Sequence, residues 1–157
     1  MDRLIPSRDD QQLMLRYRDM GDGTWAEVLL VQSANAGGYP VGATQVNASA
    51  STGGNTPISA SLPAVLGKTN YITGFEITGS GATLAASVLA TVTGVLGGTL
   101  TYVAGVVSGI LAANPPIIVQ FARPVQAAAA NQAVTLTLPA LGLGNNGAAV
   151  NLHGFVL

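Results

Sequence analysis

The sequence contains no cysteine and a single histidine, His153. Without thiols the chain forms neither disulfides nor thiolate metal sites, and one imidazole falls short of the three or four ligands that zinc usually takes. After residue 30 the only acidic side chain is Glu76, whereas a glycosidase needs a pair of carboxylates. We therefore expect no enzymatic activity, no bound metal and no cofactor.

Charge is also scarce, and nearly all of it lies at one end of the chain. Charged residues make up 8% of the sequence, against about 25% in ordinary soluble proteins. Residues 1–30 hold 10 of the 13, and only Lys68, Glu76 and Arg123 follow. The net charge of -1 offers no basic field for nucleic acid or anionic lipid. Since charge normally keeps a monomer soluble, we expect partners to cover much of the surface and uncharged polar side chains to solvate the rest.

A long uncharged stretch raises the question of a membrane segment. Residues 84–113 are long enough for a spanning helix, which needs about 20 mostly apolar residues. However, Thr91, Thr93, Thr99 and Thr101 favour strands, and Gly97-Gly98 between them marks a turn. A membrane-active protein of the holin type is the less favoured alternative.

The first third of the chain is predicted to form an arm and a linker. Leu13, Leu15 and Tyr17 alternate with Met14, Arg16 and Arg18, and Asp22-Gly23 is a strong hairpin signal, so residues 13–32 are predicted to form a β-hairpin after a polar segment, 1–12. Residues 1–32 would thus be an N-terminal arm. Residues 33–56 are rich in Gly, Ser, Thr and Ala and are predicted to be a linker.

Residues 57–157 predict an all-β domain. Short strand-like runs alternate with breaks rich in Gly, Pro and Asn, such as Gly79-Ser80-Gly81, and an Ala-rich piece at 125–134 is predicted to be a loop or one helical turn. Regular spacing of this kind is typical of a jelly-roll-like β-sandwich, here with an extended N-terminal hairpin arm. The seven predicted strands cover 58–66, 70–78, 86–93, 99–106, 116–122, 133–138 and 149–156.

Candidate contact residues follow from the same reasoning. Buried aromatics often anchor interfaces, so the aromatic residues of the arm, Tyr17, Trp25 and Tyr39, are candidates, although local packing explains them equally well. Arg123 precedes Pro124 in a predicted loop, and His153 lies near the end of the last predicted strand, so both are candidates for an oligomer interface. The candidates for contact with a larger partner are Arg16, Tyr17, Arg18, Trp25 and Tyr39.

Several stretches of the sequence resemble phage proteins. Residues 15–28, LRYRDMGDGTWAEV, resemble a segment near the start of small tailed-phage structural proteins. Residues 71–83, 92–102 and 148–155 are similar to segments of phage virion proteins. The family implied is the jelly-roll decoration, or cement, proteins of tailed-bacteriophage heads. Such proteins generally sit outside the shell as dimers or trimers and clamp neighbouring capsid subunits, and no catalytic residues come with the resemblance.

The resemblance implies a set of partners and a location. The partners would be the major capsid protein and copies of the chain itself, as a dimer or trimer, with no nucleic acid, membrane or small-molecule substrate. The location would be the outer surface of the capsid, after assembly in the host cytoplasm. A tail, neck or fibre adaptor or receptor-binding protein is the alternative, and a lectin-like module is disfavoured by the scarcity of aromatic residues.

Overall fold

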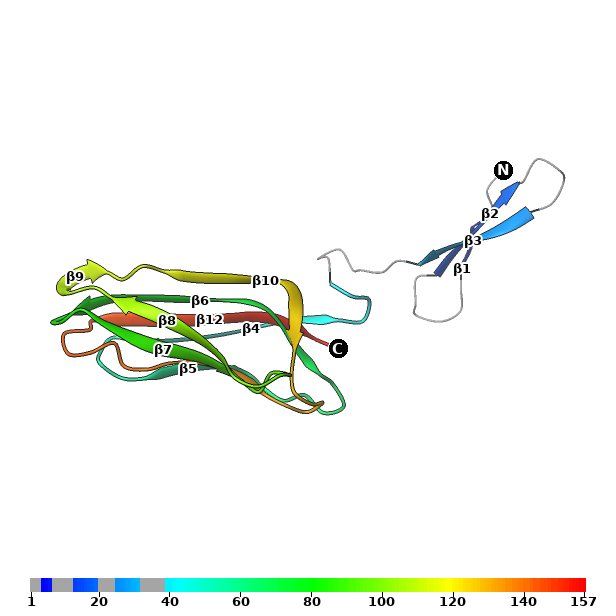
Figure 1. The fold of residues 1–157 in the computed structure, drawn as a ribbon. Helices are drawn as coiled ribbons and strands as arrows, with labels where there is room; N and C mark the ends of the chain where they lie inside the picture. Colours follow the sequence, from blue (N-terminus) through cyan, green and yellow to red (C-terminus); the bar gives the residue numbers. More distant parts are fainter. Residues whose placement is uncertain (1–3, 7–12, 20–24, 32–38) are drawn as a thin grey trace. The chain divides into compact units, whose positions relative to one another are not determined.

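The chain forms two compact units, Met1–Ala43 and Thr44–Leu157, here called the N-terminal unit and the sandwich (Figure 1). The computed structural model describes residues 4–6, 13–19, 25–31 and 39–157, with side chains from Tyr39 onward. All regular structure in these residues is β-strand, as the sequence predicts.

The N-terminal unit contains a three-stranded antiparallel sheet of order β1-β2-β3. Its strands are β1 (Leu4–Pro6), β2 (Leu13–Asp19) and β3 (Trp25–Val31). The last two pair without interruption, which confirms the strands of the predicted hairpin, whereas the predicted turn at 20–24 lies outside the described residues. The polar segment predicted over 1–12 includes a strand that was not predicted, since Leu4–Pro6 pair with β2. An edge strand tolerates proline because one side of its backbone needs no partner.

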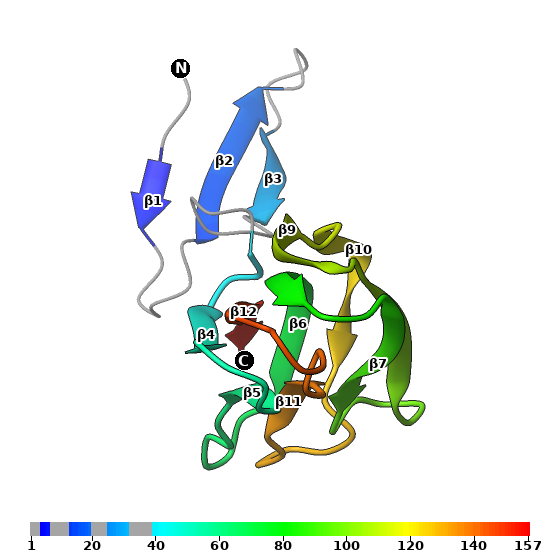
Figure 2. The same ribbon diagram turned by 90° about the vertical axis from the view of Figure 1, so that its left-hand side faces the viewer.

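The sandwich consists of two antiparallel sheets packed face to face (Figures 1 and 2). The long sheet has the order β10-β6-β12-β4, with β9 also paired to β6, and the short sheet has the order β5-β11-β7-β8. The strands are β4 (Thr44–Thr52), β5 (Ile58–Leu62), β6 (Asn70–Ala82), β7 (Ala86–Thr93), β8 (Leu100–Val106), β9 (Gly109–Ala113), β10 (Ile117–Gln126), β11 (Val134–Leu138) and β12 (Gly147–Val156).

The strand order identifies the sandwich as a jelly roll. With β9 set aside, the long sheet contains the first, eighth, third and sixth strands of the unit in that spatial order. The short sheet contains the second, seventh, fourth and fifth. Two interleaved Greek keys of this kind make up a jelly roll, so the predicted fold class is confirmed.

The core lies between the two sheets and follows the strand alternation. Val92 and Leu136 of the short sheet and Ile72 and Leu152 of the long sheet are fully buried. Phe75 is the largest fully buried side chain; its ring centroid lies 4.7 Å from that of Tyr102, in an edge contact, and 6.2 Å from that of Phe121. Burial raises the pKa of the Tyr102 phenol above its ordinary value.

The predicted linker over 33–56 is wrong for its second half. Thr44–Thr52 form β4 and pair with β12 along their whole length, so the sandwich begins at Thr44 and not at residue 57. Val46, Ala48 and Ala50 pack against the core, while the residues between them face outward. The small side chains of β4 alternate as those of any strand do, but their composition resembles that of a linker.

Other strand predictions also need correction. β6 continues through the predicted break at Gly79-Ser80-Gly81, because a register shift between Ser80 and Ala82 absorbs Gly81. β10 extends to Gln126, past Pro124, because the ladder is interrupted between Gln120 and Val125 and requires no amide donor there. The predicted loop or helical turn over 125–134 is a loop between Gln126 and Val134, the end of β10 and the start of β11, and β9 was not predicted.

Candidate interaction surfaces

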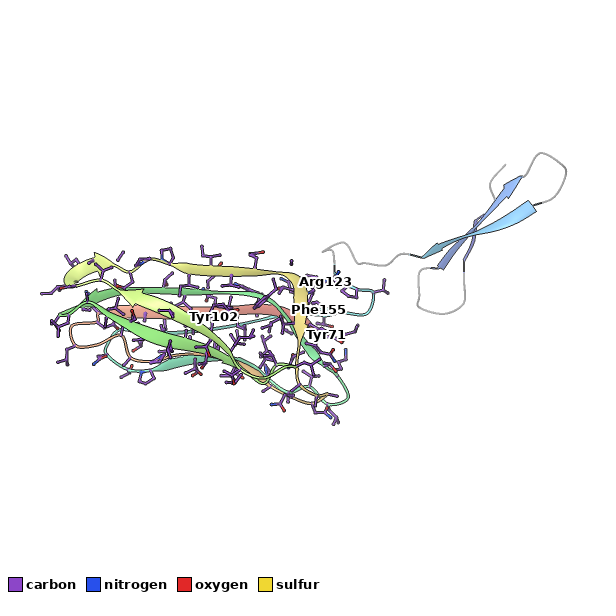
Figure 3. The ribbon with its side chains drawn as sticks, in the orientation of Figure 1. Tyr71, Tyr102, Arg123 and Phe155 are labelled. Carbon is purple, nitrogen blue, oxygen red and sulfur yellow. The ribbon has the colours of Figure 1, made fainter. Side chains whose placement is uncertain are left out.

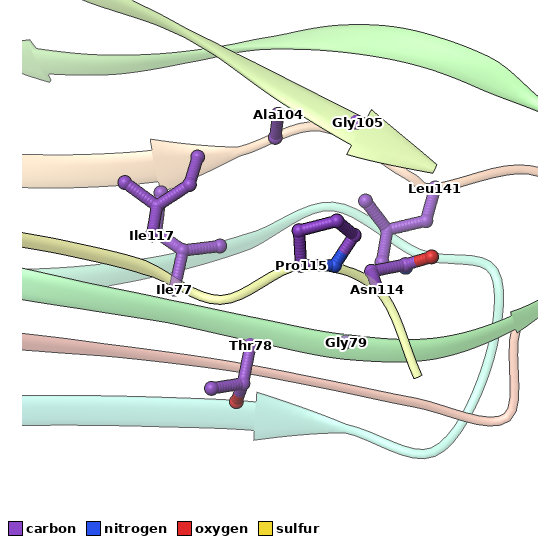
Figure 4. Close-up of a pocket in the computed structure, with 9 residues that line it drawn as sticks. All are labelled: Ile77, Thr78, Gly79, Ala104, Gly105, Asn114, Pro115, Ile117 and Leu141. Carbon is purple, nitrogen blue, oxygen red and sulfur yellow. The ribbon is translucent and has the colours of Figure 1, made fainter. Parts of the chain in front are cut away.

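Within the described part of the chain, few residues form the kind of enclosed pocket that binds a metal or a small molecule. No group of three or more His, Cys, Asp or Glu side chains is placed to hold a metal ion there. None of the described residues belongs to a helix long and apolar enough to cross a membrane. One small pocket, beside Ile77, Asn114, Ile117 and Leu141, has a volume of about 10 Å³, which is room for roughly one water molecule (Figure 4).

Five large apolar side chains are exposed at the end of the sandwich where β6 finishes. They lie in the β6–β7 loop, the β8–β9 connection, β9 and the β11–β12 loop, at the β9 end in Figure 1. None of these segments carries a charged residue. Exposed apolar clusters of this kind often mark interaction sites. The members of this apolar tip, with their exposed fractions, are Leu84 (76%), Val107 (41%), Ile110 (71%), Leu111 (87%) and Leu143 (74%).

Hydrogen bonds tie the loops of the apolar tip to one another. The Thr83 amide donates to the Leu143 carbonyl at 2.7 Å, and the Ser108 hydroxyl donates to the Thr83 carbonyl at 3.2 Å. Asn146 Nδ2 donates to the Ile110 carbonyl at 2.6 Å. The apolar side chains are therefore presented by an ordered backbone, which lowers the entropic cost of binding.

Gly81 sits beneath the tip at a position where only glycine fits. Its φ is +76°, and an added Cβ would lie 2.6 Å from the Gly144 carbonyl oxygen and 2.9 Å from that of Ile110. We expect Gly81→Ala to lower the free energy of unfolding, measured in urea, by about 1–3 kcal/mol. Gly53→Ala is the control, because no atom lies within 4 Å of its added Cβ. Equal stability of the two variants would contradict this account.

The outer face of the short sheet carries two rows of hydroxyl groups. Ser59, Thr137, Thr91 and Thr101 form one row across its four strands. The Ser59 and Thr137 hydroxyl oxygens lie 2.9 Å apart. Ser61, Thr135 and Thr93 form the next row. Hydroxyls thus solvate part of a face that carries no charge.

The outer face of the long sheet holds a polar cluster around His153. Its Nε2 lies 3.9 Å from Glu76 Oε1, and its Nδ1 lies 3.3 Å from Asn47 Oδ1. Asn151 Nδ2 donates to Glu76 Oε2 at 3.2 Å. The His153 and Glu76 side chains are 39% and 41% exposed, so water screens their interaction. The cluster links β4, β12 and β6 across the outer face of the sheet.

All five predicted partner-contact residues fall in the N-terminal unit. On β2, Arg16, Tyr17 and Arg18 pair in register with Val28, Glu27 and Ala26 of β3, and Trp25 pairs with Asp19. The sheet thus brings four of the predicted residues together. Tyr39 lies outside that sheet and is half-buried.

The two residues predicted for an oligomer interface lie on different strands of the long sheet. Arg123 is exposed on β10, His153 is on β12, and β6 lies between these strands. Figure 3 labels Arg123 together with Tyr71 and Phe155, whose rings stack with centroids 5.0 Å apart. Sequence reasoning missed the apolar tip; its one local signal is a leucine set among glycines, as in Gly142-Leu143-Gly144.

The fold and surfaces define an all-β protein in which a jelly-roll sandwich follows a separate three-stranded β unit. No protein-family model, no curated protein and no solved structure matches this chain.

Proposed function

We propose that this protein is a structural protein of a phage virion, which binds the outer surface of the capsid as a homo-oligomer and cements neighbouring capsid subunits. The observation that supports this most directly is the apolar tip. Its five large apolar side chains are exposed on hydrogen-bonded loops that contain no charged residue. A free monomer gains nothing from such a surface, whereas a protein that is covered in an assembly does.

The energetics favour many modest contacts over one tight site. Full burial of a leucine side chain contributes about 1.5–3 kcal/mol, and the ordered tip loses little entropy when it is covered. The N-terminal unit holds most of the charge of the chain and would make a second, polar contact with the shell. Linking two such modules raises the effective concentration of the second contact once the first has formed.

The choice of a capsid as the partner rests on fold and resemblance together. Jelly rolls recur in viral shells as well as in lectins. The resemblance of residues 15–28 and 71–83 to phage structural proteins favours the first of these settings. The hydroxyl groups on the outer face of the short sheet are also compatible with a protein that faces water on the surface of a particle.

The test is binding to preformed shells that lack this protein, followed by co-sedimentation. The variant combines Leu84→Asp with Leu111→Asp, which places two charges on the apolar tip. We expect its affinity to fall by about 100-fold, because each lost apolar contact is worth roughly 1.4 kcal/mol or more, a factor of ten. The control is Leu66→Asp, whose side chain is 92% exposed in the loop before β6, at the opposite end of the sandwich.

The outcomes separate the alternatives. Wild-type binding that survives in the control and is lost in the tip variant supports the proposal. Equal binding of the wild type, the tip variant and the control would show that the apolar tip does not contact the shell. If the wild-type protein binds isolated tails and not shells, the adaptor function replaces the capsid function.

A further inference from the structure

One edge of the short sheet is open and lacks the usual protection. β8 pairs with β7 at seven consecutive positions, from Ala86↔Val106 to Val92↔Leu100, without a bulge. In the part of the chain that the structure describes, no strand pairs with the other side of β8. Leu100–Val106 contains no charge and no proline. Natural proteins usually guard such an edge with lysine, proline or a bulge, because its free amides and carbonyls pair readily with another strand.

The other edges of the sandwich differ from β8. β10 carries Arg123 and Pro124 at an interruption of its ladder. β5 spans five residues and lies between Pro57 and Pro63. β4 has an open edge, but its outward residues are small or polar and none of the large exposed apolar side chains lies on it.

Exposed apolar side chains lie directly at the β8 edge. Val103 is 65% exposed, and Leu89 of β7, opposite it in register, is 55% exposed. A strand added alongside β8 would cover Val103 and satisfy the free backbone groups. β8 therefore offers both the hydrogen bonds and the apolar contact of β-strand addition.

A second copy of the chain suits this edge best. A strand edge turned over by a two-fold axis meets itself in antiparallel orientation, so hydrogen-bonding groups on one copy face their complements on the other. Like charges facing each other across the axis would oppose such pairing, and β8 and its neighbour β7 carry none.

We propose that two copies pair antiparallel through β8, so that their short sheets join into one continuous sheet. This contact deepens the homo-oligomer of the proposed function and rests on that part of it. It leaves the apolar tip as a separate surface and does not require a capsid.

The experiment measures the dimer dissociation constant of the full chain by sedimentation equilibrium. Val103→Lys and, separately, Thr101→Lys each place a charge on the exposed face of β8. Each should weaken the dimer by tenfold or more, because the two-fold axis places one added lysine from each copy on the same face of the joined sheet, where the charges repel and must stay hydrated. The matched control is Ile118→Lys on β10 of the long sheet, where the isoleucine is 62% exposed; it should dimerise like the wild type.

Hydrogen exchange separates lost pairing from lost folding. In Val103→Lys the β8 amides should exchange faster than in the wild type, while the amides of β7 and β11 keep their protection. If β7 and β11 also lose protection, the variant is misfolded and Thr101→Lys decides the result.

Three results overturn the proposal, and they separate it from the capsid function. A dimer unchanged by both lysines places the contact elsewhere and leaves the proposed homo-oligomer standing. A dimer broken only by Ile118→Lys moves the contact to the long sheet. A wild-type protein that stays monomeric overturns both the β8 contact and the homo-oligomer, whereas shell binding is measured independently.

Discussion

Replacing Phe75 with alanine is expected to lower the free energy of unfolding by about 3–5 kcal/mol. The side chain is fully buried, and its ring lies between the edge of Tyr102, from the short sheet, and Phe121 of the long sheet. Its removal leaves a cavity where the two sheets meet and removes the aromatic contacts as well. Urea unfolding followed by circular dichroism measures the loss.

The size of this effect matters because natural domains are only marginally stable. A domain has about 5–15 kcal/mol in total, so Phe75→Ala is expected to leave a substantial fraction unfolded at physiological temperature. The control is Leu89→Ala, whose side chain is 55% exposed and should change stability by less than about 1 kcal/mol. A loss below 1 kcal/mol in Phe75→Ala as well would show that the sheets do not pack as described.

Replacing Asn70 with aspartate should destabilise the protein in a strongly pH-dependent way. The Asn70 side chain is 2% exposed, and its Nδ2 donates to the Pro63 and Gln132 carbonyls, at 2.9 Å each. These bonds tie the loop before β6 to the loop before β11. A carboxylate there faces two carbonyl oxygens without a proton to share, which costs about 2–4 kcal/mol at pH 7.

The direction of the pH dependence follows from the pKa of the introduced carboxyl. Burial against two carbonyls raises its pKa in the folded protein above the value of about 4 that it has in the unfolded chain. Below about pH 4 both states hold the proton, and the charge penalty is absent. As pH rises toward the folded-state pKa, the unfolded state loses its proton first, and stability falls.

Urea unfolding of Asn70→Asp between pH 3 and 8 checks this expectation. The difference from the wild type should grow with pH over the acidic part of that range. Gln120→Glu is the matched control, because it introduces a carboxyl at an exposed position of β10 and should show no such slope. A penalty independent of pH would mean that the site is open to water.

The alternation of side chains predicted most strands, because successive residues of a strand point to opposite faces of the sheet and this pattern is visible between neighbours in the sequence. The prediction for β7 matches Ala86–Thr93 at both ends, and those for β11 and β12 differ from the structure by one or two residues. β4 was missed because its inward side chains are mostly alanines, and only the opposing strand β12 distinguishes them from a linker. β9 was missed because its pairing with β6 depends on a register shift that no local pattern signals.

The candidate surfaces were less predictable than the strands. His153 and Glu76 are 77 positions apart in the sequence, and only the pairing of β12 with β6 brings them together. The sequence around a leucine in a loop does not indicate whether its side chain is buried or exposed. Leu141, which is 5% exposed, and Leu143, which is 74% exposed, lie two residues apart in the same loop.

The amino-acid sequence by itself determined that this protein is all-β, that nearly all its charge precedes the sandwich, and that hydroxyl and amide side chains must solvate the remainder. These properties depend on composition and on contacts between neighbours in the chain. Only the tertiary structure decided that Thr44–Thr52 belong to the sandwich, that five apolar side chains are exposed at one end of it, and that the β8 edge is open. Each of these depends on which distant strands pair, and that is set by packing of the whole core.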